Sequence, residues 1–368
     1  MLRHYNQHGG GVRVYTRHLL SEMLALDVDH EFVLLYQDPR LIGSHAGPRV
    51  TEVAVRMPTS FLWDQVATRW MERRFKPDVI FNPKYSIPLT ARCKTVFVCH
   101  GLDWYVMPQG SRWTDRLNHR YLVPRYANKA DAIIAVSDTT RDQVIRYLGT
   151  SKEQVHTIYH GVDEIFRQPV SEARLSEVRS KYALPERFFL YVGQIYPPKN
   201  FGRLIRAYAK VGPELGISLV VAGEHRWLCE DDLALISELG IQQWVKQAGW
   251  IDPSELPVFY SSAIALLLPS LFESFGLPLV EAMSVGCPTI TANRYGTKEV
   301  VDGAGILVEP EDVDSIAGAM SRIIDDPALR ERTIKAGRAR ARAFSWHRCA
   351  EQTLRVLESI GPMEAISR

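Results

Sequence analysis

Short runs of β-branched and aromatic residues alternate with helical patterns along most of the chain. In the second half these runs are FFLYVG, ISLVVAGE, VKQAGW, AIALLLP, CPTITAN and GILVEP. Strands that are apolar throughout and separated by helices are typical of a parallel sheet covered by helices on both faces. The pattern therefore predicts an α/β fold with a doubly wound, Rossmann-like domain.

The first half repeats this plan through EFVLLYQ, VTEVAV, DVIFNP, TVFVCHG, AIIAVS and VHTIYHG. At 368 residues the chain is long enough for two domains of ordinary size. Periodicity is lost at HGVDEIFRQPV, which marks the boundary. We expect an N-terminal domain over 1–165 and a second domain over 166–345, facing each other across a cleft. We expect a helix over 346–368 that packs back toward the first domain.

The chain opens with a glycine-rich loop that leads into a helix, with no apolar strand before it. In a doubly wound sheet such a loop normally follows the central first strand. Either the domain lacks that strand or the natural start lies upstream, and we favour the second interpretation. The loop has neither G-x-G-x-x-G nor a P-loop lysine. Gly10 and Gly11 would instead let a sugar or an acceptor approach closely.

Composition excludes several classes of protein. The net charge of +2 gives no long-range field for nucleic acid, so an anionic partner must be held by a local site. Five widely spaced cysteines without a C-x-x-C pair fit a reducing compartment. No run is apolar enough for a membrane span, and no secretion signal is recognisable. We expect a cytoplasmic protein, with attachment to the inner face of the membrane left open.

Two glutamates, Glu273 and Glu281, flank the turn Phe-Gly-Leu-Pro directly after AIALLLP. Pro278 suits the first turn of a helix, and Gly276 allows close approach to a ligand. Carboxylates at the C-terminal end of a strand, where open α/β sheets bind ligands, are suited to sugar or ribose hydroxyls. The alternative is a surface Glu273 and a Glu281 paired with a lysine.

A second group of candidates follows the strand that ends at Gly193. Asn200 is expected to cap the next helix, which places Lys199 at a helix N-terminus where a cation is unfavourable. A bound anion would explain that lysine, and a solvated loop residue is the alternative. In the first half, His100 ends a buried strand and Asp103 follows in the next loop. His100 is either a functional residue facing the cleft or a packing residue.

These motifs resemble family 4 glycosyltransferases, which have the GT-B architecture of two facing Rossmann-like domains. The resemblance extends from GGGVRVYTRHLL through VSDTTRDQV, HGVD, VGQIYPPKN and VVAGE to ESFGLPLVEAMSVGCPTI. Its most specific element is the E-x7-E pair, here Glu273 and Glu281. The resemblance implies that Glu281 binds the ribose of a nucleotide-sugar donor, Glu273 a sugar hydroxyl and Lys199 the diphosphate.

The resemblance also implies the remaining roles. His100, Glu273 and Lys199 would be catalytic, with His100 beside the transferred sugar, and Gly10, Gly11 and Asp103 would lie on the acceptor side. The expected donor-binding residues are Gly193, Gln194, Lys199, Asn200, Glu224, Trp250, Ile251, Glu273, Ser274, Phe275, Gly276, Leu277 and Glu281. Backbone N–H groups of Phe275 to Leu277 would face phosphate or sugar, and Glu224 and Trp250 would lie near the nucleoside.

The implied activity is retaining transfer of a hexose from a nucleotide diphosphate sugar to a saccharide or lipid-linked saccharide, with no metal and no further cofactor. Many relatives have an arginine where this chain has Gln194, so Arg203 or Arg294 would assist Lys199, or diphosphate affinity is lower. Some relatives that use GDP-mannose also lack that arginine, which favours a GDP-linked, mannose-like donor. The alternatives are a GT-B epimerase or phosphorylase and a non-catalytic sugar-nucleotide-binding subunit.

Positive charge is concentrated between Arg69 and Lys129, where twelve Lys and Arg face four Asp and Glu. Four tryptophans lie in or near this segment: Trp63, Trp70, Trp104 and Trp113. Basic residues mixed with tryptophan are typical of surfaces that rest on an anionic membrane. The alternative is a solvated helix face with buried aromatic residues, so peripheral membrane contact is a hypothesis here.

Overall fold

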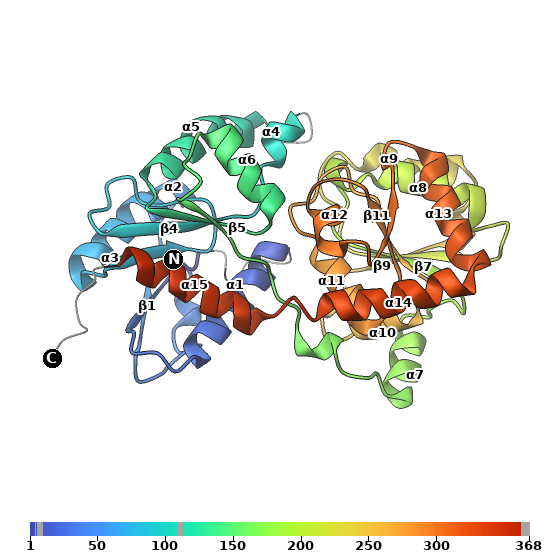
Figure 1. The fold of residues 1–368 in the computed structure, drawn as a ribbon, viewed down its shortest axis with the longest axis horizontal. Coiled ribbons are helices and arrows are strands. Elements are labelled where there is room, and N and C mark those ends of the chain that lie inside the picture. Colours follow the sequence, from blue (N-terminus) through green and yellow to red (C-terminus); the bar gives the residue numbers. More distant parts are fainter. Residues whose placement is uncertain (4, 6–9, 109–112, 362–368) are drawn as a thin grey trace. The chain divides into compact units, whose positions relative to one another are not determined.

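The computed structural model describes residues 1–3, 5, 10–108 and 113–361, and the side chains of all of these except 113–118. The described residues form two compact units (Figure 1). Unit 1 draws on Met1–Val106, Ser111–Gly161 and Trp346–Arg368, and unit 2 on Met107–Gly110 and Val162–Ser345. None of the described helices combines the length and the apolarity that a membrane span needs.

Unit 2 contains one parallel six-stranded sheet in the order β12-β11-β10-β7-β8-β9. Its strands are β7 Phe188–Val192, β8 Ser218–Ala222, β9 Val245–Gly249, β10 Leu266–Leu268, β11 Thr289–Ala292 and β12 Ile306–Val308. Every residue of β7, β10 and β11 is buried. The runs of β7 and β10 are apolar on both faces in the sequence, as expected of central strands in a parallel sheet, whereas β11 places Thr289 and Thr291 on one face.

The helices of unit 2 form two packed groups, as the doubly wound pattern predicts (Figure 1). One group consists of α8 Phe201–Val211, α9 Glu230–Glu238 and α13 Val313–Asp325. The other contains α10 Leu256–Ser262, α11 Leu277–Val285, α12 Tyr295–Val301 and α14 Pro327–Ala341, with α7 Glu172–Lys181 against α10. Short 3-10 turns are η4 Glu164–Phe166, η5 Pro197–Lys199 and η6 Gln242–Trp244.

Unit 1 contains two separate parallel sheets. The larger has the order β3-β4-β5-β6, with β3 Val79–Asn82, β4 Lys94–Cys99, β5 Ala132–Ala135 and β6 Val155–Thr157. The smaller pairs β1 Phe32–Tyr36 with β2 Val50–Ala54. Between them, the Met1 ammonium donates to Phe81 O at 2.7 Å and Leu2 N to Leu35 O at 2.8 Å. The first two residues thus bridge β1 and β3.

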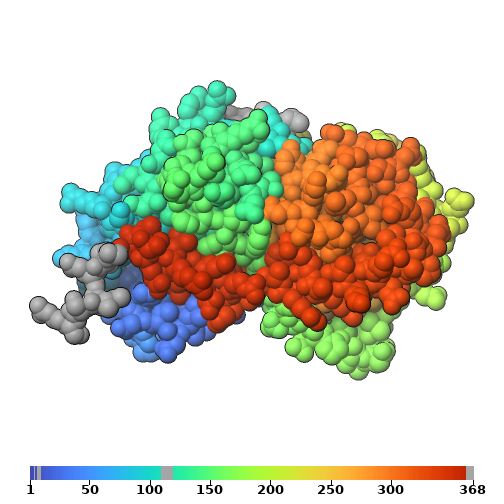
Figure 2. Space-filling model, in the orientation of Figure 1, coloured from blue at the N-terminus to red at the C-terminus, as the bar shows by residue number. Residues whose placement is uncertain are grey.

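The helices of unit 1 are α1 Gly11–Ala25, α2 Ser60–Leu62, α3 Thr68–Phe75, α4 Asp103–Val106, α5 Trp113–Lys129, α6 Asp138–Leu148 and α15 Trp346–Ile360. A 3-10 turn, η1, spans Pro39–Leu41, and a π-helical turn, η2 Trp63–Ala67, joins α2 to α3. The C-terminal helix α15 packs against α1. Figure 2 shows α15, in red, across the surface of unit 1 beside the blue N-terminal segment.

Several helices begin or end at residue types that favour capping. Ser137 caps α6 by accepting a hydrogen bond from Thr140 N, and Gly149 ends the helix at φ 70°. Asp312 caps α13 by accepting a hydrogen bond from Asp314 N. Asn200 does not act as the sequence predicts. It holds the N-cap position of α8, but its side chain makes no capping hydrogen bond.

Candidate active site

Three neighbouring strands of unit 2 lead into glycines with positive φ: Gly193 after β7, Gly223 after β8 and Gly249 at the end of β9. A Cβ atom on Gly223 would lie 1.9 Å from Gly193 O, which no side chain tolerates. Gly223 N also donates to Gly249 O at 2.7 Å. Glycine therefore lets the backbones of these loops meet closely at the carboxyl ends of the strands, the edge where open α/β sheets bind ligands.

An open pocket of about 420 Å³ lies at this edge. Its lining residues are Val221, Gly223, Glu224, His225, Gln247 and Gly249. His225 Nε2 and Gln247 Oε1 form a hydrogen bond of 3.0 Å. Glu224, expected near the nucleoside, is exposed and lines this pocket. After β9, Trp250 is 54% exposed and Ile251 is buried. Of these two side chains, only that of Trp250 is accessible to a ligand.

Lys199 and Glu273 form an ion pair between Lys199 Nζ and Glu273 Oε1. The two side chains are only 14% and 12% exposed, and Ser270 Oγ donates to the same carboxylate oxygen at 3.2 Å. The backbones of the two loops also meet, since Leu271 N donates to Pro198 O at 2.8 Å. The sequence placed both residues at the site but did not predict that each would be the other's partner.

Asn200 explains why these two loops stay together. Its Nδ2 donates to Pro269 O at 2.8 Å and to Pro310 O at 2.6 Å. Arg203 in turn donates to Asn200 Oδ1 at 3.0 Å. Asn200 is buried at φ 61°, a left-handed conformation that asparagine tolerates better than most residues. Its side chain is therefore committed to joining three loops, and this replaces the predicted helix cap.

Glu281 lies in α11, which begins after Gly276 at φ 93° and has Pro278 in its first turn, as the sequence predicts. Its Oε2 accepts a hydrogen bond of 2.7 Å from the hydroxyl of Tyr260, a fully buried residue of α10. Burial raises the pKa of Glu281 to about 7; the Tyr260 hydrogen bond opposes this rise, and the charge of Asp163 adds to it. The carboxylate thus ionises near neutral pH and is oriented by a tyrosine.

The loop between the two glutamates is fixed by packing. Phe275 is buried and its ring meets that of Phe344 edge to face, with centroids 5.5 Å apart. Gly296 N donates to Glu273 O at 3.0 Å, and a Cβ atom on Gly296 would lie 2.2 Å from Ser274 O. Gly296 must therefore be glycine for Ser274 to adopt this position. Gly296 was not among the predicted site residues, because a lone glycine in RYGTKEV carries no sign of a partner loop.

The remaining cationic candidates have partners of their own. Arg203 bonds Asn200, and Arg294 lies 3.6 Å from Glu309 and 3.4 Å from Glu311. Gln194, the neutral residue where many relatives have an arginine, is held through its backbone, since its carbonyl oxygen accepts from the Tyr191 hydroxyl at 3.0 Å. Lys199 is thus the candidate cation whose ammonium is already paired with a carboxylate of the motif.

In unit 1, His100 follows β4 and its Nε2 lies 2.8 Å from Pro83 O. Because a carbonyl oxygen only accepts, this nitrogen carries the proton and Nδ1 carries the lone pair of the neutral ring. Burial lowers the pKa of His100 to about 4, partly offset by the Pro83 hydrogen bond. Its ring packs edge to face on Tyr15, with centroids 4.8 Å apart, and lies 5.7 Å from the His160 ring.

Tyr15, His160 and Trp346 belong to one aromatic cluster with His100, and none of the three was predicted as a site residue. The Tyr15 ring lies 4.9 Å from that of His160 and 5.9 Å from that of Trp346. They come from α1, from the loop after β6 and from α15, so no local pattern connects them. His100 is accordingly an uncharged imidazole in an aromatic setting.

The acceptor-side candidates lie at helix starts in unit 1. Gly10 is the exposed N-cap of α1 at φ 94°, and Gly11 is the first residue of that helix. No atom lies within 4 Å of a Cβ built on Gly10, so the backbone there is open. Asp103 begins α4 and is half-buried. His8 and Gly9 of the same glycine-rich loop lie outside the described residues.

Comparison with known families assigns both units. The model for glycosyl transferases group 1 matches residues 175–340, and that for glycosyltransferase family 4 matches residues 9–165. The chain is 30% identical to the O-antigen chain mannosyltransferase B of Escherichia coli over 296 residues, 77% of this chain and 75% of the relative. It is 31% identical to the MMP alpha-(1->4)-mannosyltransferase of Mycolicibacterium hassiacum, with 95% of each chain covered. It spans 37% of the serotype-specific mannosyltransferase WbdA of E. coli, at 30% identity.

Solved structures agree on the fold. Sucrose-phosphate synthase from Thermosynechococcus elongatus matches with a TM-score of 0.75 at 24% identity, over 95% of this chain and 94% of that one. HepE from Anabaena, in complex with UDP and glucose, matches with a TM-score of 0.76 at 19% identity, over 95% and 96%. The chain therefore belongs to glycosyltransferase family 4, and it is a glycosyltransferase of GT-B fold.

Proposed function

We propose that the protein is a retaining hexosyltransferase that moves a mannose-like sugar from a nucleotide diphosphate sugar to a saccharide or lipid-linked saccharide. A GDP-linked donor is favoured. The names of two relatives at 30–31% identity, both mannosyltransferases, support the sugar. The neutral Gln194 supports the base by the resemblance given above. The observation that carries the proposal is the pairing of Lys199 with Glu273 at the carboxyl edge of the unit 2 sheet.

In the proposed site Lys199 changes partners when the donor binds. Without donor its ammonium is neutralised by Glu273. A diphosphate carries more negative charge than one carboxylate, so it attracts the ammonium and releases Glu273 to accept hydrogen bonds from sugar hydroxyls. Backbone N–H groups of Gly276 and Leu277, at the start of α11, would add donors for phosphate.

Glu281 would hold the ribose. The two ribose hydroxyls can donate hydrogen bonds. Tyr260 donates to Oε2 of Glu281, so Oε1 remains to accept from the ribose hydroxyls. Ionised Glu281 accepts better than its protonated form, so donor affinity should rise as pH rises through about 7.

The reaction breaks the bond from the anomeric carbon to the donor phosphate oxygen and forms one to the acceptor oxygen on the same face. The acceptor proton passes to the departing diphosphate, whose charge Lys199 stabilises. His100, neutral at physiological pH, would hydrogen-bond a hydroxyl of the transferred sugar through Nδ1. The expectation that no metal and no further cofactor takes part stays a prediction, as does a cytoplasmic location, with attachment to the inner face of the membrane left open.

Transfer by the purified protein tests the proposal. GDP-, UDP- and dTDP-linked hexoses are incubated with saccharide acceptors, with and without EDTA, and the new anomeric proton is followed by NMR. We expect transfer from a GDP-linked donor with retained configuration, undiminished by EDTA and abolished in Glu281→Ala. Inversion would contradict the mechanism. Tight nucleotide binding without turnover on any acceptor would instead identify a non-catalytic binding subunit.

A further inference from the structure

One segment of unit 1 exposes an unusual number of large apolar side chains. Phe61, Leu62, Val66 and Trp70 are 48%, 38%, 48% and 48% exposed, and we refer to them as the apolar stripe. They lie on the continuous stretch α2–η2–α3, and the last three are four positions apart, which places them on one helical face. In the rest of the described chain the large exposed apolar residues are Ile42, Tyr121, Leu215, Leu228, Leu239 and Trp250. The stripe is thus a local concentration.

The adjacent face of the same stretch, one position further along the chain, packs into the core. Trp63, Ala67 and Met71 are buried with Leu35 and Ile80 in one apolar cluster. The Trp63 indole also donates to Val55 O at 2.9 Å. The segment therefore has its own core face, and the stripe is a second apolar face that the described chain covers only in part. Exposed apolar patches of this kind mark interaction surfaces.

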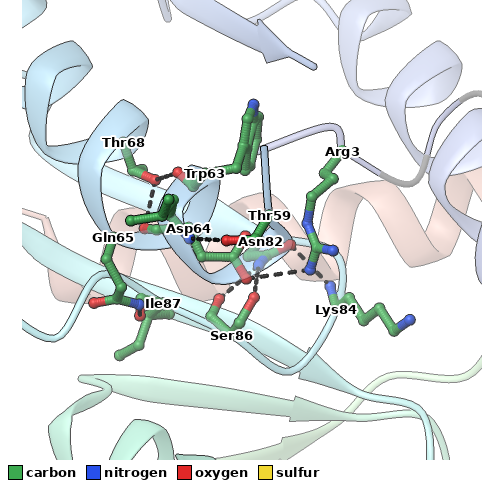
Figure 3. Close-up of polar contacts among 11 residues, drawn as sticks. Arg3, Thr59, Trp63, Asp64, Gln65, Thr68, Asn82, Lys84, Ser86 and Ile87 are labelled. Atoms are coloured by element: carbon green, nitrogen blue, oxygen red, sulfur yellow. Dashed lines mark hydrogen bonds and ion pairs between the residues drawn. The ribbon is translucent and has the colours of Figure 1, made fainter. Parts of the chain in front are cut away.

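The acidic residues of this segment are buried, whereas most of its basic residues are exposed. Between Arg56 and Pro77 the acidic residues are Asp64 and Glu72, and both are buried. Asp64 pairs with Arg3 at 3.1 Å (Figure 3). Glu72 pairs with Arg69 and accepts hydrogen bonds from Arg92 N at 2.6 Å and Cys93 N at 2.9 Å.

Four of the five basic residues of the segment face outward instead, and the fifth is Arg69, the partner of Glu72. Arg56, Arg73, Arg74 and Lys76 are all exposed. Because both carboxylates of the segment are turned inward and paired, its exposed charges beside the apolar stripe are positive, and the nearest exposed carboxylate in sequence is Asp78, directly after the segment.

We propose that this face docks on an anionic lipid bilayer. The stripe would enter the headgroup region, with Trp70 at the depth that tryptophan favours, and the four basic residues would meet lipid phosphates. A second copy of the chain fits the face poorly, because two-fold pairing would bring the same four cations of both copies together. An anionic surface neutralises them.

The structure also changes which tryptophans are relevant. The sequence-based candidates for membrane contact were Trp63, Trp70, Trp104 and Trp113. Trp63 and Trp104 are buried core residues, and the side chain of Trp113 lies outside the described residues. Among the three whose side chains are described, Trp70 is the exposed one, and its neighbours Phe61, Leu62 and Val66 were not among the candidates.

Sedimentation with lipid vesicles tests the proposal. We expect the protein to bind vesicles of phosphatidylglycerol and phosphatidylcholine, and to bind pure phosphatidylcholine at least ten-fold more weakly. Phe61→Ser/Val66→Ser/Trp70→Ser should weaken binding to the anionic vesicles at least ten-fold, and Arg73→Glu/Arg74→Glu should remove the preference for them. Matched controls in unit 2, Leu215→Ser/Leu228→Ser/Leu239→Ser and Arg322→Glu/Arg332→Glu, should bind as the wild type does.

Two further measurements distinguish docking through the stripe from loss of folding and from self-association. Vesicles that contain brominated lipid should quench tryptophan fluorescence; Trp70→Phe should lose much of that quenching, and Trp250→Phe, which removes another exposed indole, should not. Circular dichroism melting identifies variants that fail to fold. Unchanged vesicle binding in the folded stripe variant overturns the proposal, as does light scattering that shows the stripe holding two copies together. Because vesicle binding needs no donor, its loss or retention is independent of the proposed transfer.

Discussion

The candidate residues of the two units differ in charge. In unit 2, Lys199 and Glu273 neutralise each other, and Glu281 ionises at a pKa of about 7 against a tyrosine hydroxyl. In unit 1, His100 is an imidazole with a pKa of about 4 among aromatic rings, bonded to a backbone carbonyl. Unit 2 thus contains a cation and a carboxylate that a charged ligand can separate. Unit 1 instead presents the uncharged Nδ1 of His100 among apolar rings.

This difference indicates a division of labour. A diphosphate needs a cation and can compete for one that is already half-buried and paired. A sugar hydroxyl carries no charge, so it can also be bound by an uncharged acceptor, which a neutral histidine supplies at lower desolvation cost than a carboxylate. Binding of the nucleotide should therefore depend on unit 2, and turnover should depend on both units.

Replacement of His100 should give the largest effect on turnover. His100→Ala is expected to lower kcat about 100-fold while nucleotide affinity changes less than about two-fold, because the ring acts on the sugar and not on the nucleotide. Steady-state kinetics and calorimetry with the nucleoside diphosphate check both values. His156→Ala removes a histidine from β6 of the same unit and should leave kcat intact. Unchanged kcat in His100→Ala would show that His100 is a packing residue without a role in turnover.

Replacement of Lys199 should affect the diphosphate more than the nucleoside. Lys199→Ala removes a charge-assisted contact worth on the order of 1.5–3 kcal/mol, so affinity for the nucleoside diphosphate should fall about 10- to 100-fold. Affinity for the nucleoside alone should barely change in calorimetric titrations. Lys210→Ala, which removes the partner of the exposed Asp314, is the matched control. Equal losses for nucleoside and diphosphate would rule out the assigned role.

Removal of one hydroxyl tests whether Glu281 is positioned by its neighbour. Tyr260→Phe deletes a hydrogen bond that lowers the pKa of Glu281, so that pKa should rise further above 7. Nucleotide affinity at pH 7 should fall about five-fold and recover in part at pH 9, as measured by titration at several pH values. Tyr182→Phe removes a similar 2.7 Å bond to Glu255 and should leave nucleotide binding unchanged. A pH profile identical to that of the wild type would show that Tyr260 only packs.

The smallest expected effect is on stability. The folded-state pKa of Glu281 lies above its ordinary value of 4.5, so the folded protein is more stable while the carboxyl is protonated and loses that stability as pH rises through about 7. Glu281→Gln cannot ionise and keeps an oxygen that accepts from Tyr260. The free energy of unfolding of Glu281→Gln, relative to that of the wild type, should increase by on the order of 1–2 kcal/mol between about pH 5.5 and pH 8.5. Denaturant melts of both proteins measure it; a pH-independent difference would refute the shifted pKa.

The sequence predicts the elements of this fold well and their partners poorly. All twelve runs quoted from the sequence are strands, and the α/β class with GT-B architecture is confirmed. Strands buried on both faces, such as β7, leave a strong local signature, whereas β2 and β9 contain no buried residue. The bond between Lys199 and Glu273 joins residues 74 positions apart. No local pattern encodes such a contact, and the same holds for Tyr260 with Glu281 and for Asn200 with two proline carbonyls.

Burial of individual side chains was the other point where the sequence was insufficient. Trp63 and Trp70 are separated by two helical turns in the same stretch, yet one is fully buried and the other is 48% exposed. A tryptophan suits either face, because its ring is apolar and its N–H can find a carbonyl, as Trp63 does with Val55. Only the packing against β1 and β3 decides between them.

The most direct measurement of the central claim is a crystal structure of the protein with a GDP-linked sugar bound. We predict that the Lys199 ammonium has left Glu273 and lies within hydrogen-bonding distance of the diphosphate, with the Glu281 carboxylate on the ribose hydroxyls. A nucleotide sugar held elsewhere, with the pair of Lys199 and Glu273 still closed and Glu281 out of reach of the ribose, would contradict the proposed site.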